Sequence, residues 1–219
     1  MEVITIRDGI VTLTDEQVVR RVGLQAFKDR LAIGLKVQTP VLPRGAVLYS
    51  AKGTKSVIVL EEPPQMRTIT FRSQRGSTRE FTIPMPWVYF FPVFHNNALE
   101  DLYLFFSRHC IQHAGESLCF PTLPNTFDEC RVCLGDYRYS VTQSLASRIS
   151  DISRYYWEST FNLDASNLYS NRMPDAIVSA TPDGAELFEG WATVTLSRVT
   201  ELTWQVHDRV DRILSRLLP

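Results

Sequence analysis

The chain has 219 residues, enough for one large domain, and its hydrophobic content of 44% is that of an ordinary globular protein. A net charge of -1 argues against a general attraction to nucleic acid, and no apolar run reaches the roughly 20 residues that span a membrane. The opening residues lack a signal-peptide pattern and four cysteines are too few for a disulfide scaffold, so we expect a cytoplasmic protein.

Residues 1–35 are predicted to form a hairpin and a helix. The stretch "EVITIRDGIVTL" alternates in polarity and turns at Asp8 and Gly9. Thr14 and Gln17 then have the spacing of a capping box, in which each side chain bonds the backbone N–H of the other residue. A helix is expected to follow and to end near Gly34.

Residues 45–137 are predicted to form an antiparallel meander that ends in an active-site loop. Four segments bounded by turn residues read as strands, and two further segments, "PWVYFFPVF" and "LEDLYLFFSR", are almost continuously apolar. Such runs are typical of strands covered on both faces. His95–Asn97 between them has the composition of a turn.

Residues 138–219 are predicted to be mainly helical. Apolar residues recur at helical spacing from Val141 to Tyr156 and again from Leu202 to Leu217. The second run includes Val206, and it would place His207 on the polar face of the last helix. The element order predicts an α+β fold with one domain over residues 1–219.

The four cysteines first suggest a zinc site. Cys110 and His113 form one ligand pair and Cys130 and Cys133 another, each pair with two intervening residues. Two such pairs could supply the four ligands of tetrahedral zinc. This alternative describes a zinc-stabilised binding protein.

Two other interpretations concern the thiols alone. A thioredoxin-like dithiol normally opens a helix, whereas Gly135 and the absence of helical spacing follow Cys133. Free cysteines are usually buried and behave as small hydrophobic residues. This is the preferred interpretation for Cys110 and Cys119. No glycine-rich phosphate loop or paired-carboxylate motif stands out, so we expect no cofactor.

A third interpretation is a resemblance. The segment "LPNTFDECRVCLGD" resembles the active-site segment of ubiquitin-conjugating enzymes, in which a His-Pro-Asn turn precedes the catalytic cysteine. Here Pro124 and Asn125 form the turn, and Cys133 follows the asparagine by the family's interval of eight residues. Cys133-Leu134-Gly135 is most similar to the ending found in prokaryotic ubiquitin-conjugating-like families, including the B component of the PRTRC system of plasmids and phages.

The resemblance implies a ubiquitin-conjugating-like fold and a mechanism. Cys133 would receive a ubiquitin-like modifier from an activating enzyme, hold it as a thioester and pass it to an amine of a protein substrate. Leu134 would anchor the loop in the core. Asn125 would either cap the turn or donate a hydrogen bond to the oxyanion of the reaction.

The segment departs from the family pattern in three places. Leu123 replaces the histidine of the turn, and the acidic residue expected two positions after the cysteine is Gly135, with Asp136 one position later. The family's downstream acidic residue has no clear counterpart, although Asp164 lies in a suitable region. These departures leave open a noncatalytic scaffold of the same fold, for instance in a plasmid or phage system.

Overall fold

The computed structural model describes residues 3–7, 10–15, 18–23, 44–73, 76–137, 145–165, 172–177 and 185–219. The chain divides into two compact units, Met1–Pro40 and Val41–Pro219. Within the described residues, no helix is both long enough and apolar enough to cross a membrane.

The first unit contains a three-stranded antiparallel sheet of β1 (Val3–Arg7), β2 (Ile10–Asp15) and β3 (Val18–Gly23). The predicted hairpin is therefore present as β1 and β2. The predicted start of the helix is wrong, because β3 occupies those residues and pairs with β2 along its length. Three valines in β3 favour an extended backbone over a helix. The rest of the predicted helix lies outside the described residues.

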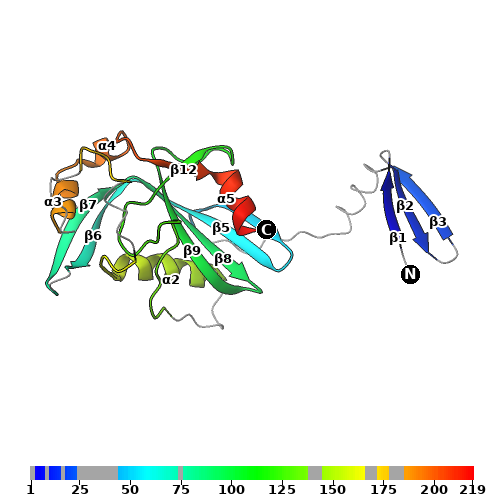
Figure 1. Ribbon diagram of the computed structural model, residues 1–219, viewed down its shortest axis with the longest axis horizontal. Coiled ribbons are helices and arrows are strands. Elements are labelled where there is room, and N and C mark those ends of the chain that lie inside the picture. The colour runs from blue at the N-terminus through cyan, green and yellow to red at the C-terminus, as the bar shows by residue number, and fades with distance from the viewer. Residues whose placement is uncertain are drawn as a thin grey trace. The chain divides into compact units, whose positions relative to one another are not determined.

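A six-stranded sheet, in the order β12-β10-β9-β8-β5-β4, forms the centre of the second unit (Figure 1). The turn predicted at His95–Asn97 joins β8 to β9, and Asn96 and Asn97 both have positive φ, as a tight hairpin turn requires. The strands are β4 (Ala46–Lys52), β5 (Lys55–Glu62), β8 (Trp87–His95), β9 (Ala98–Ser107), β10 (Ser117–Cys119) and β12 (Val206–Arg209).

The pairing differs from the simple meander that the sequence predicted. All six predicted strands are present, but β5 pairs with β8. The intervening β6 (Gln65–Arg72) and β7 (Thr78–Met85) form a hairpin in a second sheet, which β11 (Thr160–Phe161) joins in parallel to β6. The pairing of β11 brings the segment after residue 158 alongside β6.

Helices pack on both sides of the six-stranded sheet (Figure 1). The helix predicted from Val141 to Tyr156 is present as α2 from Leu145 onward, while residues 141–144 lie outside the described residues. The last helix is shorter than predicted. It starts at Val210, because residues 206–209 pair with β10 as β12 and leave Val206 57% exposed. The helices are α2 (Leu145–Glu158), α3 (Ala185–Ala192), α4 (Leu196–Val199) and α5 (Val210–Leu217).

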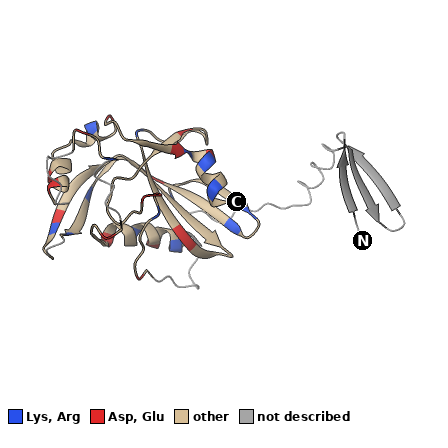
Figure 2. Ribbon diagram, viewed as in Figure 1, with Lys and Arg blue, Asp and Glu red and all other residues tan. Residues whose placement is uncertain are grey.

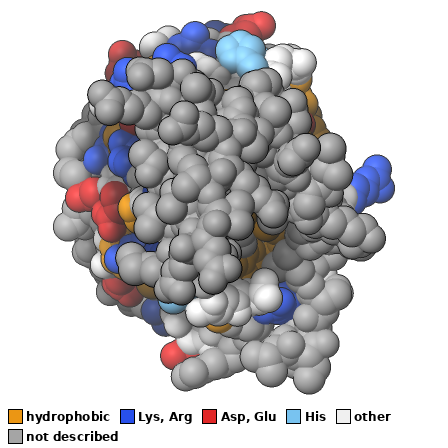
Figure 3. All heavy atoms as spheres, turned by 90° about the vertical axis from the view of Figure 1, so that its right-hand side faces the viewer, with side chains coloured by type: hydrophobic (Ala, Val, Ile, Leu, Met, Phe, Trp, Pro, Cys, Tyr) orange, Lys and Arg blue, Asp and Glu red, His pale blue; other side chains and the backbone are white. Residues whose placement is uncertain are grey.

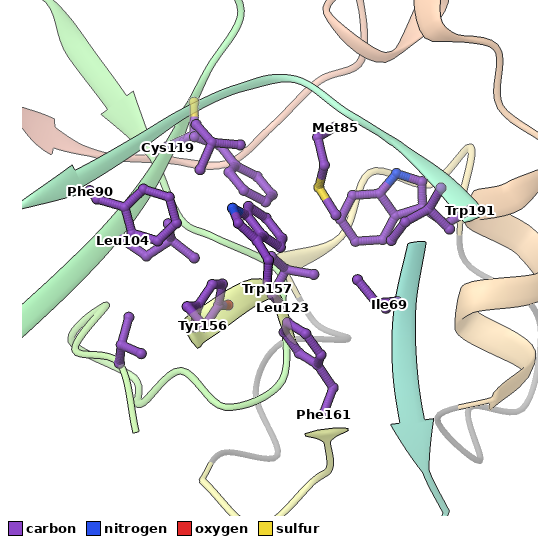
Figure 4. Close-up of a cluster of buried hydrophobic side chains, with 14 of the residues drawn as sticks. Ile69, Met85, Phe90, Leu104, Cys119, Leu123, Tyr156, Trp157, Phe161 and Trp191 are labelled. Atoms are coloured by element: carbon purple, nitrogen blue, oxygen red, sulfur yellow. The ribbon is translucent and has the colours of Figure 1, made fainter. Parts of the chain in front are cut away.

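The side chains of β8 point alternately to the two faces of the sheet, and they belong to two separate clusters of the core. Phe90 and Phe94 belong to the cluster that contains the buried side chains of α2, whereas Tyr89 and Phe91 belong to the cluster that contains Val210 of α5. Successive side chains of a strand point to opposite faces, so the nearly unbroken apolar run is buried on both sides, as predicted. Figure 4 shows part of the first cluster.

Charged residues are distributed over the helices, the loops and several strands of the second unit (Figure 2). On the face drawn in Figure 3, the described basic and acidic side chains are mixed. Neither sign dominates the described part of that face, in agreement with the net charge of -1.

Candidate active site

The candidate site is built on the loop that follows β10, where the sequence predicted the reactive turn. Two hydrogen bonds hold this loop against β9: the Val132 N–H donates to the Leu102 carbonyl over 2.7 Å, and the Leu104 N–H donates to the Cys130 carbonyl over 2.9 Å. The backbone is left-handed at Asn125 and Cys130, with φ of +62° and +69°. Such angles are uncommon outside glycine and persist only where surrounding contacts impose them. The loop therefore has a shape fixed by the fold.

Asn125 connects the two walls of the site. Its carbonyl accepts the Cys133 N–H over 2.7 Å, which fixes the backbone beside the thiol. Its side-chain Nδ2 donates to the Thr160 carbonyl over 3.1 Å and to Ser159 Oγ over 3.4 Å, and its Oδ1 accepts the Asn162 N–H over 3.1 Å. The carboxamide is buried and has partners for both amide hydrogens and for its oxygen. Asn125 thus attaches the segment after α2 to the cysteine loop.

Cys133 is exposed and lines a cleft of about 730 Å³. One wall is the cysteine loop itself. The other consists of the end of α2 and the segment after it, with the end of β6 beside them. The remaining lining residues are Arg72, Asn125, Phe127, Leu134, Gly135, Asp136, Tyr155, Glu158, Ser159, Thr160, Asn162, Asp164 and Ala165.

The cleft is acidic. Asp136, Glu158 and Asp164 line it together with one basic residue, Arg72. None of these four side chains forms an ion pair with another described residue. Asn162 Oδ1 accepts the Asp164 N–H over 2.9 Å, so the backbone of Asp164 is fixed. An excess of carboxylates favours a cationic group over an anionic one in this cleft.

The other predicted loop residues lie near Cys133 but play different parts. Leu123, in place of the family's histidine, is fully buried and packs near Trp157 in the core (Figure 4), while its carbonyl accepts a hydrogen bond from Thr126 Oγ1 over 2.7 Å. Pro124 is buried beside it. Leu134 is partly buried and packs against the core, and Asp136 is exposed.

The other cysteines are less available than Cys133. Cys119 and Cys130 are buried, and burial raises the pKa of the Cys119 thiol to about 11 and the pKa of the Cys130 thiol to about 12. Cys110 is only partly exposed and accepts a hydrogen bond from the Gln112 side chain over 2.8 Å. The prediction that Cys110 is buried is therefore only partly right, whereas that for Cys119 is confirmed.

The four residues of the alternative zinc site do not converge. Cys130 lies in the core and Cys133 in the open cleft, while His113 Nε2 lies 3.5 Å from Glu116 Oε1. In the part of the chain that the structure describes, no group of three or more His, Cys, Asp or Glu side chains is placed to hold a metal ion. Cys130 ends the turn of residues 127–130 and is buried, whereas Cys133 follows the bridged residues Arg131 and Val132 and is exposed.

Sequence reasoning missed the wall opposite the cysteine. Tyr155, Glu158, Ser159 and Asn162 reach the cleft because α2 and β11 bring them there. The available signal was the polar stretch "ESTFNLD", residues 158–164, which begins where the apolar face of the predicted helix ends.

Comparison with known proteins yields a family match. No curated protein matches the chain. No solved structure matches it either. The family model of prokaryotic E2 family D matches residues 29–182, which are more than half of the 219 residues and include the whole cysteine loop. This membership associates the chain with conjugation of ubiquitin-like proteins and with protein partners. The chain belongs to prokaryotic E2 family D.

Proposed function

We propose that this protein carries a ubiquitin-like modifier as a thioester on Cys133 and transfers it to an amine of a protein substrate. The observation that carries the proposal is the position of Cys133: it is an exposed thiol on a rigid, non-helical loop, and it lines the cleft. Thioester exchange needs an accessible thiolate and space for the acyl chain.

The charge of the cleft supports an amine as acceptor. A protonated amine is attracted by the carboxylates of Asp136, Glu158 and Asp164, and it must lose a proton to become a nucleophile. We propose Asp164 as the residue that receives this proton, because its backbone is fixed by Asn162 and Asn162 is bonded to Asn125. Asn125 then acts as a positioning residue.

The proposed partners are a modifier, an activating enzyme that uses ATP, and a protein substrate. The ending Cys133-Leu134-Gly135 further suggests a relationship to the B component of the PRTRC system. We propose that the protein uses no cofactor of its own and acts in the cytoplasm as a single conjugating domain with associated helices.

The experiment incubates the wild-type protein and three variants with the modifier and activating enzyme encoded beside its gene, and with ATP. Wild type is expected to form an adduct that thiol reductants cleave. Cys133→Ser should form a reductant-resistant oxyester, because the nucleophile becomes an oxygen. Cys133→Ala should form none.

Cys110→Ser is the matched control, since it removes a partly exposed thiol outside the cleft and should charge like wild type. An adduct that survives Cys133→Ala would contradict the proposal. No adduct on wild type would favour the noncatalytic scaffold of the same fold.

A further inference from the structure

The turn directly after Cys133 presents unpaired backbone donors. Residues 134–137 form a turn closed by the Tyr137 N–H, which donates to the Leu134 carbonyl over 3.0 Å. Gly135, the second residue, has a φ of +51°, whereas Asp136, the third, is not left-handed, a combination that a type II′ turn has. The backbone N–H groups of Gly135 and Asp136 have no partner among the described residues, and both residues line the cleft with Cys133.

Two other donors beside the thiol, the Cys133 N–H and the Asn125 side-chain amide, already have partners. The Cys133 N–H donates to the Asn125 carbonyl over 2.7 Å. Both hydrogens of the Asn125 amide donate into the opposite wall, to the Thr160 carbonyl and to Ser159 Oγ. A donor that stabilises an oxyanion is most effective when it is oriented in advance and needs no rearrangement during the reaction. The Asn125 amide would first have to release Thr160.

We propose that the backbone N–H groups of Gly135 and Asp136 form the oxyanion hole of this site, and that Asn125 does not. The inference rests on the proposed acylation of Cys133. Glycine at position 135 is suited to this oxyanion hole. It adopts a left-handed φ at little cost, and it places no side chain beside the reacting carbonyl. Successive amides in a turn of this kind form concave sites for anions.

The role follows from the bonds that change. The Cys133 thiolate attacks the carbonyl carbon of a donor thioester, a carbon–sulfur bond forms, and the carbonyl electron pair moves onto oxygen. The two N–H groups donate to this oxyanion. When the carbonyl reforms, the donor's carbon–sulfur bond breaks and the donor leaves as a thiolate. In the transfer step the amine attacks the acyl carbon, its proton passes to a base, and the Cys133 thiolate leaves.

The test compares Asp136→Pro with Asp136→Ala in the full chain. Both variants lose the carboxylate, but only proline also removes the N–H, and its φ near -65° is compatible with a residue whose φ is not left-handed. The probe is a small N-acetylglycine thioester, and mass spectrometry follows acylation of Cys133. We expect Asp136→Pro to be acylated about 100-fold more slowly than Asp136→Ala, the usual loss for one oxyanion donor.

Alkylation by iodoacetamide supplies the control reaction, because it consumes the same thiolate without forming an oxyanion. Equal alkylation rates and similar melting temperatures for the two variants, together with unequal acylation rates, would support the inference. Equal acylation rates would overturn it for Asp136. Replacement of the Gly135 N–H by an ester oxygen through semisynthesis repeats the test at the second donor, and unchanged acylation in both would overturn the whole proposal.

The two proposals fail differently. If wild type forms no thioester with the probe or with the modifier, the proposed function is wrong. If wild type is acylated at Cys133 and the paired variants do not differ, only the oxyanion hole is wrong. Asn125→Gly is compared with wild type in the same two reactions. If its acylation by the probe is slower while its alkylation by iodoacetamide is unchanged, Asn125 would be the oxyanion donor and the inference would be contradicted.

Discussion

Asn125 is the residue on which the geometry of the cleft depends most. Its backbone carbonyl bonds the Cys133 N–H, and its side chain bonds Thr160 and Asn162, which are 35 and 37 residues away in the sequence. It presents these groups from a left-handed backbone, which asparagine tolerates better than most residues. One side chain therefore sets the distance between the two walls of the cleft.

Asn125→Ala is expected to destabilise the protein by about 2 kcal/mol, because it removes the hydrogen bonds that the buried Asn125 carboxamide forms with the Thr160 carbonyl and the Asn162 N–H. Chemical denaturation measures the effect. Asn125→Gly removes the same side chain but tolerates the positive φ, so the difference between the variants isolates the backbone cost. Equal stability of Asn125→Ala and wild type would show that the side-chain bonds do not hold the wall.

His207 gives a pH-dependent prediction. It lies between the rings of Phe105 and Phe120, and burial, with a contribution from Arg216, lowers the pKa of its imidazole below the ordinary value. The folded state then binds a proton less readily than the unfolded state. The resulting contribution to stability is present above the unfolded pKa of about 6.5 and is lost as pH falls through the folded pKa.

His207→Phe should keep the ring contacts and remove this titration. Melting temperatures from pH 8 to pH 5 are expected to fall more steeply for wild type than for the variant below about pH 6.5. Parallel curves would show that His207 is not the titrating group.

At the residue scale, the sequence could relate Cys133 to Asn125 because they belong to one loop and Cys133 lies eight positions after Asn125. It could not predict that the Asn125 amide is already bonded, since its partners depend on how α2 and β11 return to the loop. For the same reason Asp164 could be suspected but not placed.

At the scale of elements, Glu62 connects the sheet to α2. The carboxylate at the end of β5 accepts hydrogen bonds from Arg67 over 2.6 Å, from Trp157 Nε1 over 3.0 Å and from Ser153 Oγ over 3.3 Å. The Arg67 guanidinium also stacks over the Trp157 ring. Because α2 carries Tyr155 and Glu158 into the cleft, this contact positions one wall of the site.

Glu62→Ala is expected to cost about 2 kcal/mol of unfolding free energy, because it leaves the largely buried Arg67 without its carboxylate. Glu100→Ala is the matched control. It breaks the more exposed Lys55–Glu100 pair and should cost less than about 1 kcal/mol. Similar losses in the two variants would contradict a special role for Glu62.

The elements that the sequence predicted correctly have a strong local pattern, such as the almost continuous apolar runs of β8 and β9 and the helical spacing of α2. The errors occur where pairing with another element overrides the local pattern. The valines of β3 and Val206 of β12 both fit a helical spacing, yet each segment satisfies its backbone by pairing with a neighbouring strand. The departure of β6 and β7 from the meander likewise depends on long-range pairing.

At the scale of the whole molecule, the second unit supports one exposed thiol with a sheet covered on both faces. The cysteine loop is bonded to β9, α2 packs behind it, and β11 joins the cleft wall to β6. Of the four cysteines, this arrangement buries two and leaves one only partly exposed. The fold therefore makes Cys133 the most accessible of the four thiols.

The most direct test is to map the adduct that wild type forms with its modifier, activating enzyme and ATP. Peptide mass spectrometry under non-reducing conditions should place the modifier's C-terminal residues on the peptide that contains Cys133, and reductant should release them. An adduct on Cys110, Cys119 or Cys130, or an adduct that reductant does not release, would contradict the account.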